Sequence, residues 1–481
     1  MTILGAFVIP VALLFFFISP ISLLPLLVVV SIFEVGSIFN GAIGSFEFGI
    51  APFHFVAGLI AIRLAQQIWQ KGKILPSDSE AIKPLAILLI AFWGWAFCSA
   101  FFMPNLFSGM PVYDPREGVD IVFSQLAPLR WTMSNLAQAM YLSLNVCSVL
   151  YAMHMARTEK QTKKIETAFL WAAGIAVGAG LIQRIGPWLG WSYPYEIFAN
   201  NPVYFVGGND QEINGQQRVN STFAEASMAG AFLSAAALGL LASYLSGRRS
   251  IWRLLGLILV IMTLIATIST TGFVSFAVTG LALLIYFNPL AKNGLKSRLS
   301  TGWLAIISLL GIGALVVALN PSFFQAALSV TAEKGETTSY VNRLMSDLYG
   351  LLLFKNTWGI GVGLGSNRPS SLISGLLSTL GAVGTGLFAL ILFKIFKMFP
   401  GKVAPSAMQM AFWALIGMLV GGAVGVSDLN HPSLWGLFIV LVTQLNRYSA
   451  KCSAMDKIAA RSRLHLYGSL QGGPGGLAPA D

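Results

Sequence analysis

The fold is decided by apolar stretches such as PLAILLIAFWGWAFCSAF, from Pro84 to Phe101, which contains no lysine, arginine, aspartate or glutamate. A helix of about 20 such residues crosses the hydrocarbon core of a bilayer. Further apolar stretches predict spans at 43–65, 132–156, 165–189, 222–246, 251–268, 271–288, 302–320, 371–396, 407–427 and 433–447. The run 3–33 is interrupted by prolines and is read either as one long kinked span or as a short hairpin. We therefore expect an all-α, polytopic membrane protein of 12 or 13 transmembrane helices.

The composition agrees with this expectation. Hydrophobic residues make up 56% of the chain and charged residues 10%, and the mean hydropathy is +0.73. Soluble domains carry roughly 25% charged residues, so an ordinary soluble enzyme is excluded. The three cysteines, Cys98, Cys147 and Cys452, show neither a disulfide framework nor metal-ligand spacing. No cleavable signal peptide is predicted, because no basic region precedes the first apolar run.

The basic residues alternate from one connection to the next. Most of the 30 lysine and arginine residues fall in every second connection and in the tail: Arg63, Lys71, Lys73, Lys83, Arg157, Lys160, Lys163, Lys164, Arg248, Arg249, Arg253, Lys292, Lys296, Arg298, Lys394, Lys397, Lys402, Arg447, Lys451, Lys457, Arg461 and Arg463. The positive-inside rule places these connections and the C-terminus in the cytoplasm. The net charge of +11 is thus a signal of topology and of contact with lipid headgroups, not of nucleic-acid binding.

The chain is expected to form one transmembrane bundle over 1–447, followed by a basic and then Gly/Pro-rich tail, 448–481, that is predicted to be disordered. On the face opposite the basic connections, three connections are long, at about 102–131, 190–221 and 321–370. The remaining basic residues lie on or near this face: Arg116, Arg130, Arg184, Arg218, Lys334, Arg343, Lys355 and Arg368. Most are arginine, whose planar guanidinium fork suits phosphate.

No nucleotide, metal or nucleophile motif is present in the sequence. The four histidines, His54, His154, His431 and His465, are not at metal-ligand spacing, so no metal or other cofactor is expected. The stretch Gly359 to Gly365 resembles a phosphate-binding loop, but it lacks the strand and helix that flank one. A close-packing turn is the favoured interpretation.

Two segments of the outer face are candidate sites. In Gln216 to Ser227, Arg218 and Glu225 would lie two turns apart on a helix that leads into a span of small residues. The alternative is a polar loop in which Glu225 is a first-turn acid favoured by the helix dipole. The second segment carries Lys334, Arg343 and Arg368, for which the alternative is a set of solvated loop charges.

The order of these parts, over about 165–445, resembles the O-antigen ligase and O-antigen polymerase superfamily. Arg218 followed by Ser221-Thr222-Phe223-Ala224-Glu225-Ala226-Ser227 is similar to its Gly-x-Phe-x-x-Pro-(Asn/Ser) pattern, with Ser221 in place of Gly and Ala226 in place of Pro. Ser269-Thr270-Thr271-Gly272 resembles a Ser-Arg-Gly-like break without the Arg. Arg343, the turn Gly359 to Gly365, and Ser366 to Ser371 where the family often has His-Asn then follow in order.

The resemblance implies a GT-C-like bundle in the bacterial inner membrane, with a large periplasmic loop. It implies a glycosyltransferase that uses an undecaprenyl-diphosphate-linked glycan as donor at the periplasmic face, without a metal or cofactor. A polymerase of exopolysaccharide or O-antigen is favoured, whereas a ligase to lipid A-core stays open. A chain-length regulator and polysaccharide export proteins are possible partners. A transporter or flippase is the rival class, although few ionisable residues lie mid-span and no internal repeat is evident.

The resemblance also suggests roles for particular residues. Arg218 and Arg343 match the motif positions and are the predicted diphosphate clamp. Arg368, Arg184, Arg130 and Lys334 are further candidates for binding the substrate. Glu225 is the predicted general base, with Asp210 and Glu212 as alternatives in the preceding loop.

Overall fold

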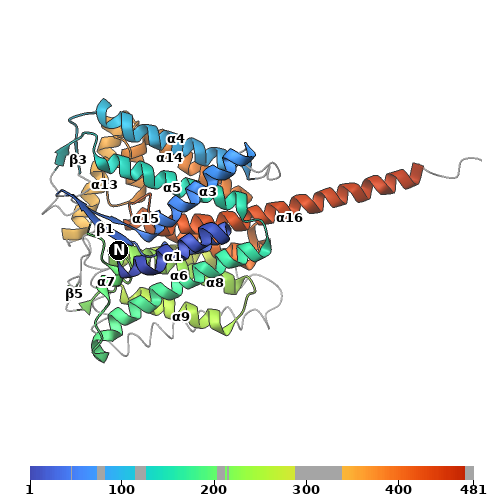
Figure 1. Cartoon of the computed structure of the whole chain (residues 1–481), viewed down its shortest axis with the longest axis horizontal. Coiled ribbons are helices and arrows are strands. Elements are labelled where there is room, and N and C mark those ends of the chain that lie inside the picture. Colours follow the sequence, from blue (N-terminus) through green and yellow to red (C-terminus); the bar gives the residue numbers. More distant parts are fainter. Residues whose placement is uncertain are drawn as a thin grey trace, which may run out of the picture.

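A computed structural model describes residues 1–44, 46–72, 82–113, 126–202, 212–213, 216–287 and 338–471. These residues form a mostly helical bundle with little sheet (Figure 1). In the described ranges, seven helices are long and apolar enough to cross a membrane: α4 (Lys83–Leu106), α5 (Met133–Met155), α6 (Glu159–Ile185, continued by η2 to Leu189), α8 (Ala226–Leu245), α10 (Thr270–Phe287), α14 (Leu372–Met398) and α15 (Ser406–Gly425). The predicted class, a polytopic helical membrane protein, is confirmed at this level.

Most predicted spans agree with helices to within a few residues. A break also occurs near the predicted residues 269–272, because residues 267–269 separate α9 (Ile251–Ala266) from α10. Ile268 adopts a positive φ of 45° in this break. The predicted span 302–320 lies outside the described residues.

The run 3–33 is a helical hairpin. Helix α1 (Ile3–Ile18) is joined through η1 (Pro20–Ser22) to α2 (Leu23–Val30). Pro20 begins the short connecting turn, where its missing N–H costs no hydrogen bond. The two ends meet, since the N–H of Thr2 donates to the carbonyl of Ile38 at 3.1 Å.

The predicted span 43–65 is wrong at its start. Its first residues belong to an antiparallel hairpin of β1 (Phe39–Ile43) and β2 (Phe46–Ile50), and the helix α3 runs instead over Pro52–Lys71. Gly44 takes a φ of 63° in the turn, which glycine adopts without steric cost. Two smaller hairpins pair β3 (Pro111–Tyr113) with β4 (Leu126–Pro128), and β5 (Glu212–Ile213) with β6 (Gln216–Gln217).

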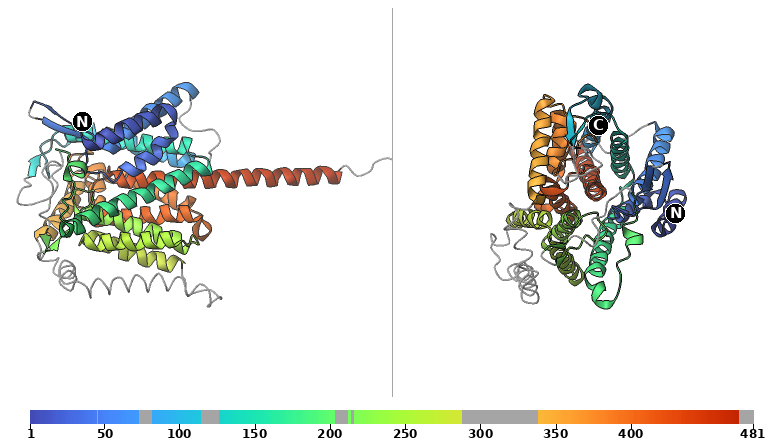
Figure 2. Two further views of the ribbon diagram at one scale, coloured as in Figure 1. Left: turned by 60° about the horizontal axis from the view of Figure 1, so that its bottom comes forward. Right: turned by 90° about the vertical axis from the view of Figure 1, so that its left-hand side faces the viewer.

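The three hairpins lie at the same end of the bundle as α7 (Tyr195–Phe198) and α13 (Thr338–Asn356) (Figure 1). We call this the hairpin end and the opposite end, where α6 begins, the basic end. Helix α16 (Pro432–Gln471) leaves the bundle at the basic end and projects far beyond it (Figure 2). Residues 448–471 of the predicted disordered tail are thus described as helix, and residues 472–481 lie outside the described residues. The stretch 448–471 is rich in Ala, Lys, Arg and Leu, which favour helix, and glycines follow directly at 472–473.

Helix α8 is the centre of the bundle. Nearly all of its residues are buried, and it packs against α15, α10 and α9. Its many alanines, glycines and serines let neighbouring backbones approach closely, as small residues do between membrane helices. At the crossing with α10, a methyl group added to Gly272 would lie 2.8 Å from the Cα of Gly230.

This crossing predicts opposite effects for two substitutions on one helix. Gly272→Ala should destabilise the protein by about 1–3 kcal/mol, because the new methyl group meets backbone that cannot yield. Gly280→Ala is the matched control. The nearest atom to its new methyl group is a side-chain carbon of Leu238 at 3.7 Å, so better helix propensity should leave stability equal or higher. Thermal midpoints of the purified full-length variants compare the two, and equal midpoints would contradict the close crossing.

Candidate functional site

Arg218 and Glu225, from one segment before α8, meet Arg343 from a distant part of the chain at the hairpin end. Arg343 lies on α13, and its Nη2 is 3.5 Å from Oε2 of Glu225, the residue that precedes α8. Arg218 interacts electrostatically with both residues. The side chains of Arg343 and Glu225 are 30% and 44% exposed, so a ligand has access to the pair. The predicted clamp residues and the predicted base are therefore neighbours.

Arg218 is held at the carbonyl end of α9. Its Nε donates to the carbonyl of Thr267 at 3.2 Å, where the helix dipole favours a cation. Burial lowers the pKa of Arg218 to about 10, to which the nearby Arg343 contributes, while Glu225 opposes the shift. Arg218 still carries its charge at neutral pH, and two guanidinium groups thus share this region with Glu225.

The segment from Arg218 to Glu225, which we call the strap, is fixed by polar contacts to α6 and its loop. The side-chain oxygen of Gln183 accepts from the N–H groups of Asn220 and Ser221 at 3.1 and 2.9 Å. The hydroxyl of Tyr193 donates to the carbonyl of Ser221. The strap is therefore held in a defined shape before α8 begins.

Ser221 has a φ of 53°, the left-handed region that favours glycine. A glycine would adopt this backbone conformation without steric cost. The serine compensates with a hydrogen bond from its hydroxyl to the carbonyl of Ala176 at 2.6 Å.

The strap also rests on a buried acid and a buried histidine. Glu34, 4% exposed, follows α2, and its Oε2 accepts from the N–H of Ala224 at 3.3 Å. The same oxygen lies 3.7 Å from Nε2 of His431, whose ring stacks near that of Phe223. Burial alone lowers the pKa of His431, but Glu34 and Asp428 outweigh it and raise the pKa above its ordinary 6.5.

A third contact region joins α13 to the turn before α14. One carboxylate oxygen of Asp347 accepts from the N–H groups of Ser370 and Ser371, both at 2.9 Å. Burial raises the pKa of Asp347, although these hydrogen bonds and Arg343, one helical turn away, oppose the shift. Arg368 in the same turn acts electrostatically on Asp428. Arg368 therefore lies beside the Asp428–His431–Glu34 group.

The glycine-rich stretch Gly359 to Gly365 is a packing turn. Its four glycines all have φ between 78° and 100°. The N–H groups of Val362 and Gly363 donate to the carbonyls of Ser378 and Thr379 in α14, just before its kink at Gly381, and that of Leu364 donates to the hydroxyl of Ser99. Because these donors are used within the protein, the stretch does not present the free N–H groups of a phosphate loop.

The other candidates lie elsewhere. Arg184 donates to the carbonyl of Gln217 at 3.3 Å and thus supports the backbone just before Arg218. Arg130 is exposed, with no contact to the arginine cluster among the described residues. Lys334 and Asp210 fall outside the described residues, and Glu212 is described only as part of β5.

Glu34, Asp428 and His431 were missed by the sequence reasoning. A signal was present, because Glu34 is an isolated acid after an apolar helix and Asp428-Leu-Asn-His431 connects two apolar helices. Ionisable residues so placed in a membrane protein are costly and suggest function. Within the described ranges, no group of three or more His, Cys, Asp and Glu side chains is positioned to hold a metal ion.

No protein-family model matches this chain, and no curated protein matches it.

The Glu34–His431 contact predicts a pH dependence of stability. Because the folded pKa of His431 is raised, its contribution is complete below about pH 6.5 and is lost as the pH rises through the raised value. Glu34→Gln keeps an oxygen for Ala224 but removes the charge. Without this charge the pKa of His431 falls, so the variant should show a smaller fall in thermal midpoint above pH 6.5. The pKa of Asp428, which Glu34 also raises, falls as well.

Thermal midpoints between pH 6 and 9 test this prediction. Glu196→Gln, at an exposed position of α7, removes a charge from the same end and should leave the profile unchanged. Identical profiles for the wild type and Glu34→Gln would contradict it.

Proposed function

We propose that this chain is a bacterial envelope polysaccharide polymerase, which transfers lipid-diphosphate-linked glycan repeat units onto a growing chain. The observation that carries the proposal is the meeting of Arg218, Arg343 and Glu225 at one end of a membrane bundle. Two guanidinium groups close together repel each other. Glu225 pairs with Arg343, and Asp347, which also interacts with Arg343, accepts from two backbone N–H groups, so the positive charge of the two arginines is offset only in part. An anion bound between them would relieve that repulsion.

A diphosphate suits this arrangement. Each arginine offers a planar fork of N–H donors for phosphate oxygens. In the proposed transfer, an acceptor hydroxyl attacks the anomeric carbon of the donor sugar, and the bond from that carbon to the diphosphate oxygen breaks. Negative charge then builds on the leaving lipid diphosphate, where fixed cations stabilise the transition state.

The hydroxyl proton needs an acceptor, and we assign this role to Glu225. Its Oε2 accepts from the hydroxyl of Ser227 at 2.8 Å and faces Arg343 at 3.5 Å, so the carboxylate is oriented from two sides. At 44% exposure it remains open to an incoming acceptor. The same three residues would serve a ligase, in which the acceptor is lipid A-core in place of a glycan chain. A flippase is the alternative outside enzymes.

For topology, we propose that the hairpin end faces the periplasm of the inner membrane and that α16 ends in the cytoplasm. The support is the positive-inside rule, since Lys160, Lys163 and Lys164 begin α6 at the opposite end from Arg218. The 12 or 13 spans expected from sequence, and a large periplasmic loop over about 321–370, belong to the same proposal.

Arg218→Ala and Arg343→Ala should each lower glycan transfer on the order of 10²–10³-fold, the loss typical of removing a group that stabilises transition-state charge. Arg343→Lys should also be impaired, because a point charge does not replace a fork. Arg130→Ala, outside the cluster, is the control. The assay gives reconstituted protein a purified lipid-linked repeat unit and measures glycan length, and near-normal product from both alanine variants would refute the clamp.

The same assay separates the alternatives. A lengthened glycan supports the polymerase, transfer to added lipid A-core supports the ligase, and an unchanged donor that crosses the bilayer supports the flippase.

The proposed orientation predicts the labelling of Cys452, an exposed residue on the projecting half of α16. In a variant with Cys98→Ser and Cys147→Ser, a membrane-impermeant maleimide should not label intact spheroplasts but should label them after lysis. Glu196→Cys, introduced with Cys452→Ser, should show labelling before lysis. The reverse pattern would invert the topology.

A further inference from the structure

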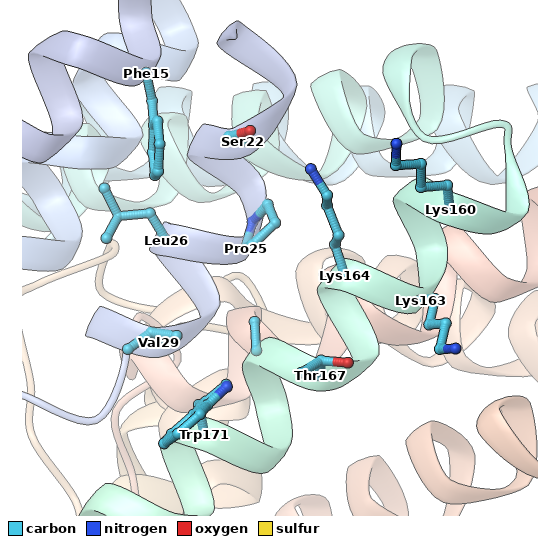
Figure 3. A pocket seen from close by; sticks show the side chains of 11 residues that line it. Phe15, Ser22, Pro25, Leu26, Val29, Lys160, Lys163, Lys164, Thr167 and Trp171 are labelled. Carbon is cyan, nitrogen blue, oxygen red and sulfur yellow. The ribbon is translucent and has the colours of Figure 1, made fainter.

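A cavity of about 530 Å³ lies at the basic end, beside the first turns of α6 (Figure 3). Helices α1 and α2 form one wall with Phe15, Pro25, Leu26 and Val29. The opposite wall is α6, which contributes Lys160, Lys163, Lys164, Thr167, Ala168 and Trp171. The volume falls within the roughly 300–1,000 Å³ of ligand sites.

The cavity is divided into a charged mouth and an apolar floor. Lys160 and Lys164 are one helical turn apart, and their side chains extend toward the side where Ser22 lies (Figure 3). Trp171 lies two turns further along α6, beside Val29. Trp171 is seven positions after Lys164 on the helix, which is a length of about 10 Å. A ligand that fits both parts must be an elongated amphiphile with an anionic head.

The acids of α6 near the mouth do not neutralise Lys160 and Lys164. The two acids of this part of α6 are paired with other cations: Glu159 with Arg447 at 2.8 Å, and Glu166 with Arg248 and Arg253. Within the described part of the chain, Lys160 and Lys164 form no ion pair with a carboxylate. The charges at the mouth are thus available to an external anion.

We propose that this cavity binds an anionic glycerophospholipid of the cytoplasmic leaflet. Its phosphate lies at Lys160 and Lys164, and an acyl chain lies along the floor between α2 and α6. Basic pockets between helices on the cytoplasmic side are typical binding sites for such headgroups. A soluble anion would leave the apolar floor unfilled, and a second copy of the chain would bring the same positive charge to the mouth. The site is separate from the proposed transferase site.

The test titrates detergent-purified full-length protein with phosphatidylglycerol or phosphatidylcholine and counts bound lipid by native mass spectrometry. The wild type should prefer phosphatidylglycerol on the order of tenfold, given the attraction of two lysines for an anionic headgroup. The double variant Lys160→Gln/Lys164→Gln should lose this preference. The control, Lys397→Gln/Lys402→Gln, removes two charges from another basic connection and should retain it.

Two further measurements examine the floor and the head separately. Val29→Trp should reduce binding of both lipids, because the indole fills the space of the acyl chain. Inorganic phosphate should not displace phosphatidylglycerol. Equal binding of both lipids to the wild type, a preference that survives in the double lysine variant, or full displacement by phosphate would each overturn the proposal. Unchanged thermal midpoints show that the variants are folded.

Discussion

The close packing of small residues around α8 is the constraint on which the rest of the site depends. Glycine and alanine on α8 let α10 and α15 approach backbone to backbone, as at Gly230 and Gly272. Consequently the start of α8, the break between α9 and α10, and the end of α15 lie together at one end. The Arg343 guanidinium illustrates this, since it lies so close to Gly425 at the end of α15 that a methyl group there would be 2.9 Å away.

The polar residues at this end of the bundle differ in how far they are exposed. Arg218, Glu225 and Arg343 are accessible in part, whereas Glu34 and His431 are almost fully buried behind the strap. The buried pair contacts the strap through Ala224 and Phe223 and does not contact the arginines directly. Its position indicates that it holds the strap in place, which keeps Glu225 within reach of Arg343.

Sequence reasoning located most of the helices because hydropathy and length are local properties, as for α4 and α14. It failed at 43–65, where a glycine turn and a proline converted the start of an apolar run into a hairpin. Arg218 and Glu225 could be proposed from one motif, but their meeting with Arg343 depends on how α13 packs against α14. Glu34 and His431 lie in different connections and become a pair only through that kind of long-range packing.

Helix α16 has 40 residues, and at 1.5 Å per residue it is about 60 Å long, roughly twice the thickness of a bilayer's hydrocarbon core. Because its first turn follows His431 inside the bundle, about half of its length must stand clear of the lipid. A protein that binds the far half would be held at a fixed distance from the membrane, because a continuous helix has a defined length and an unstructured linker does not.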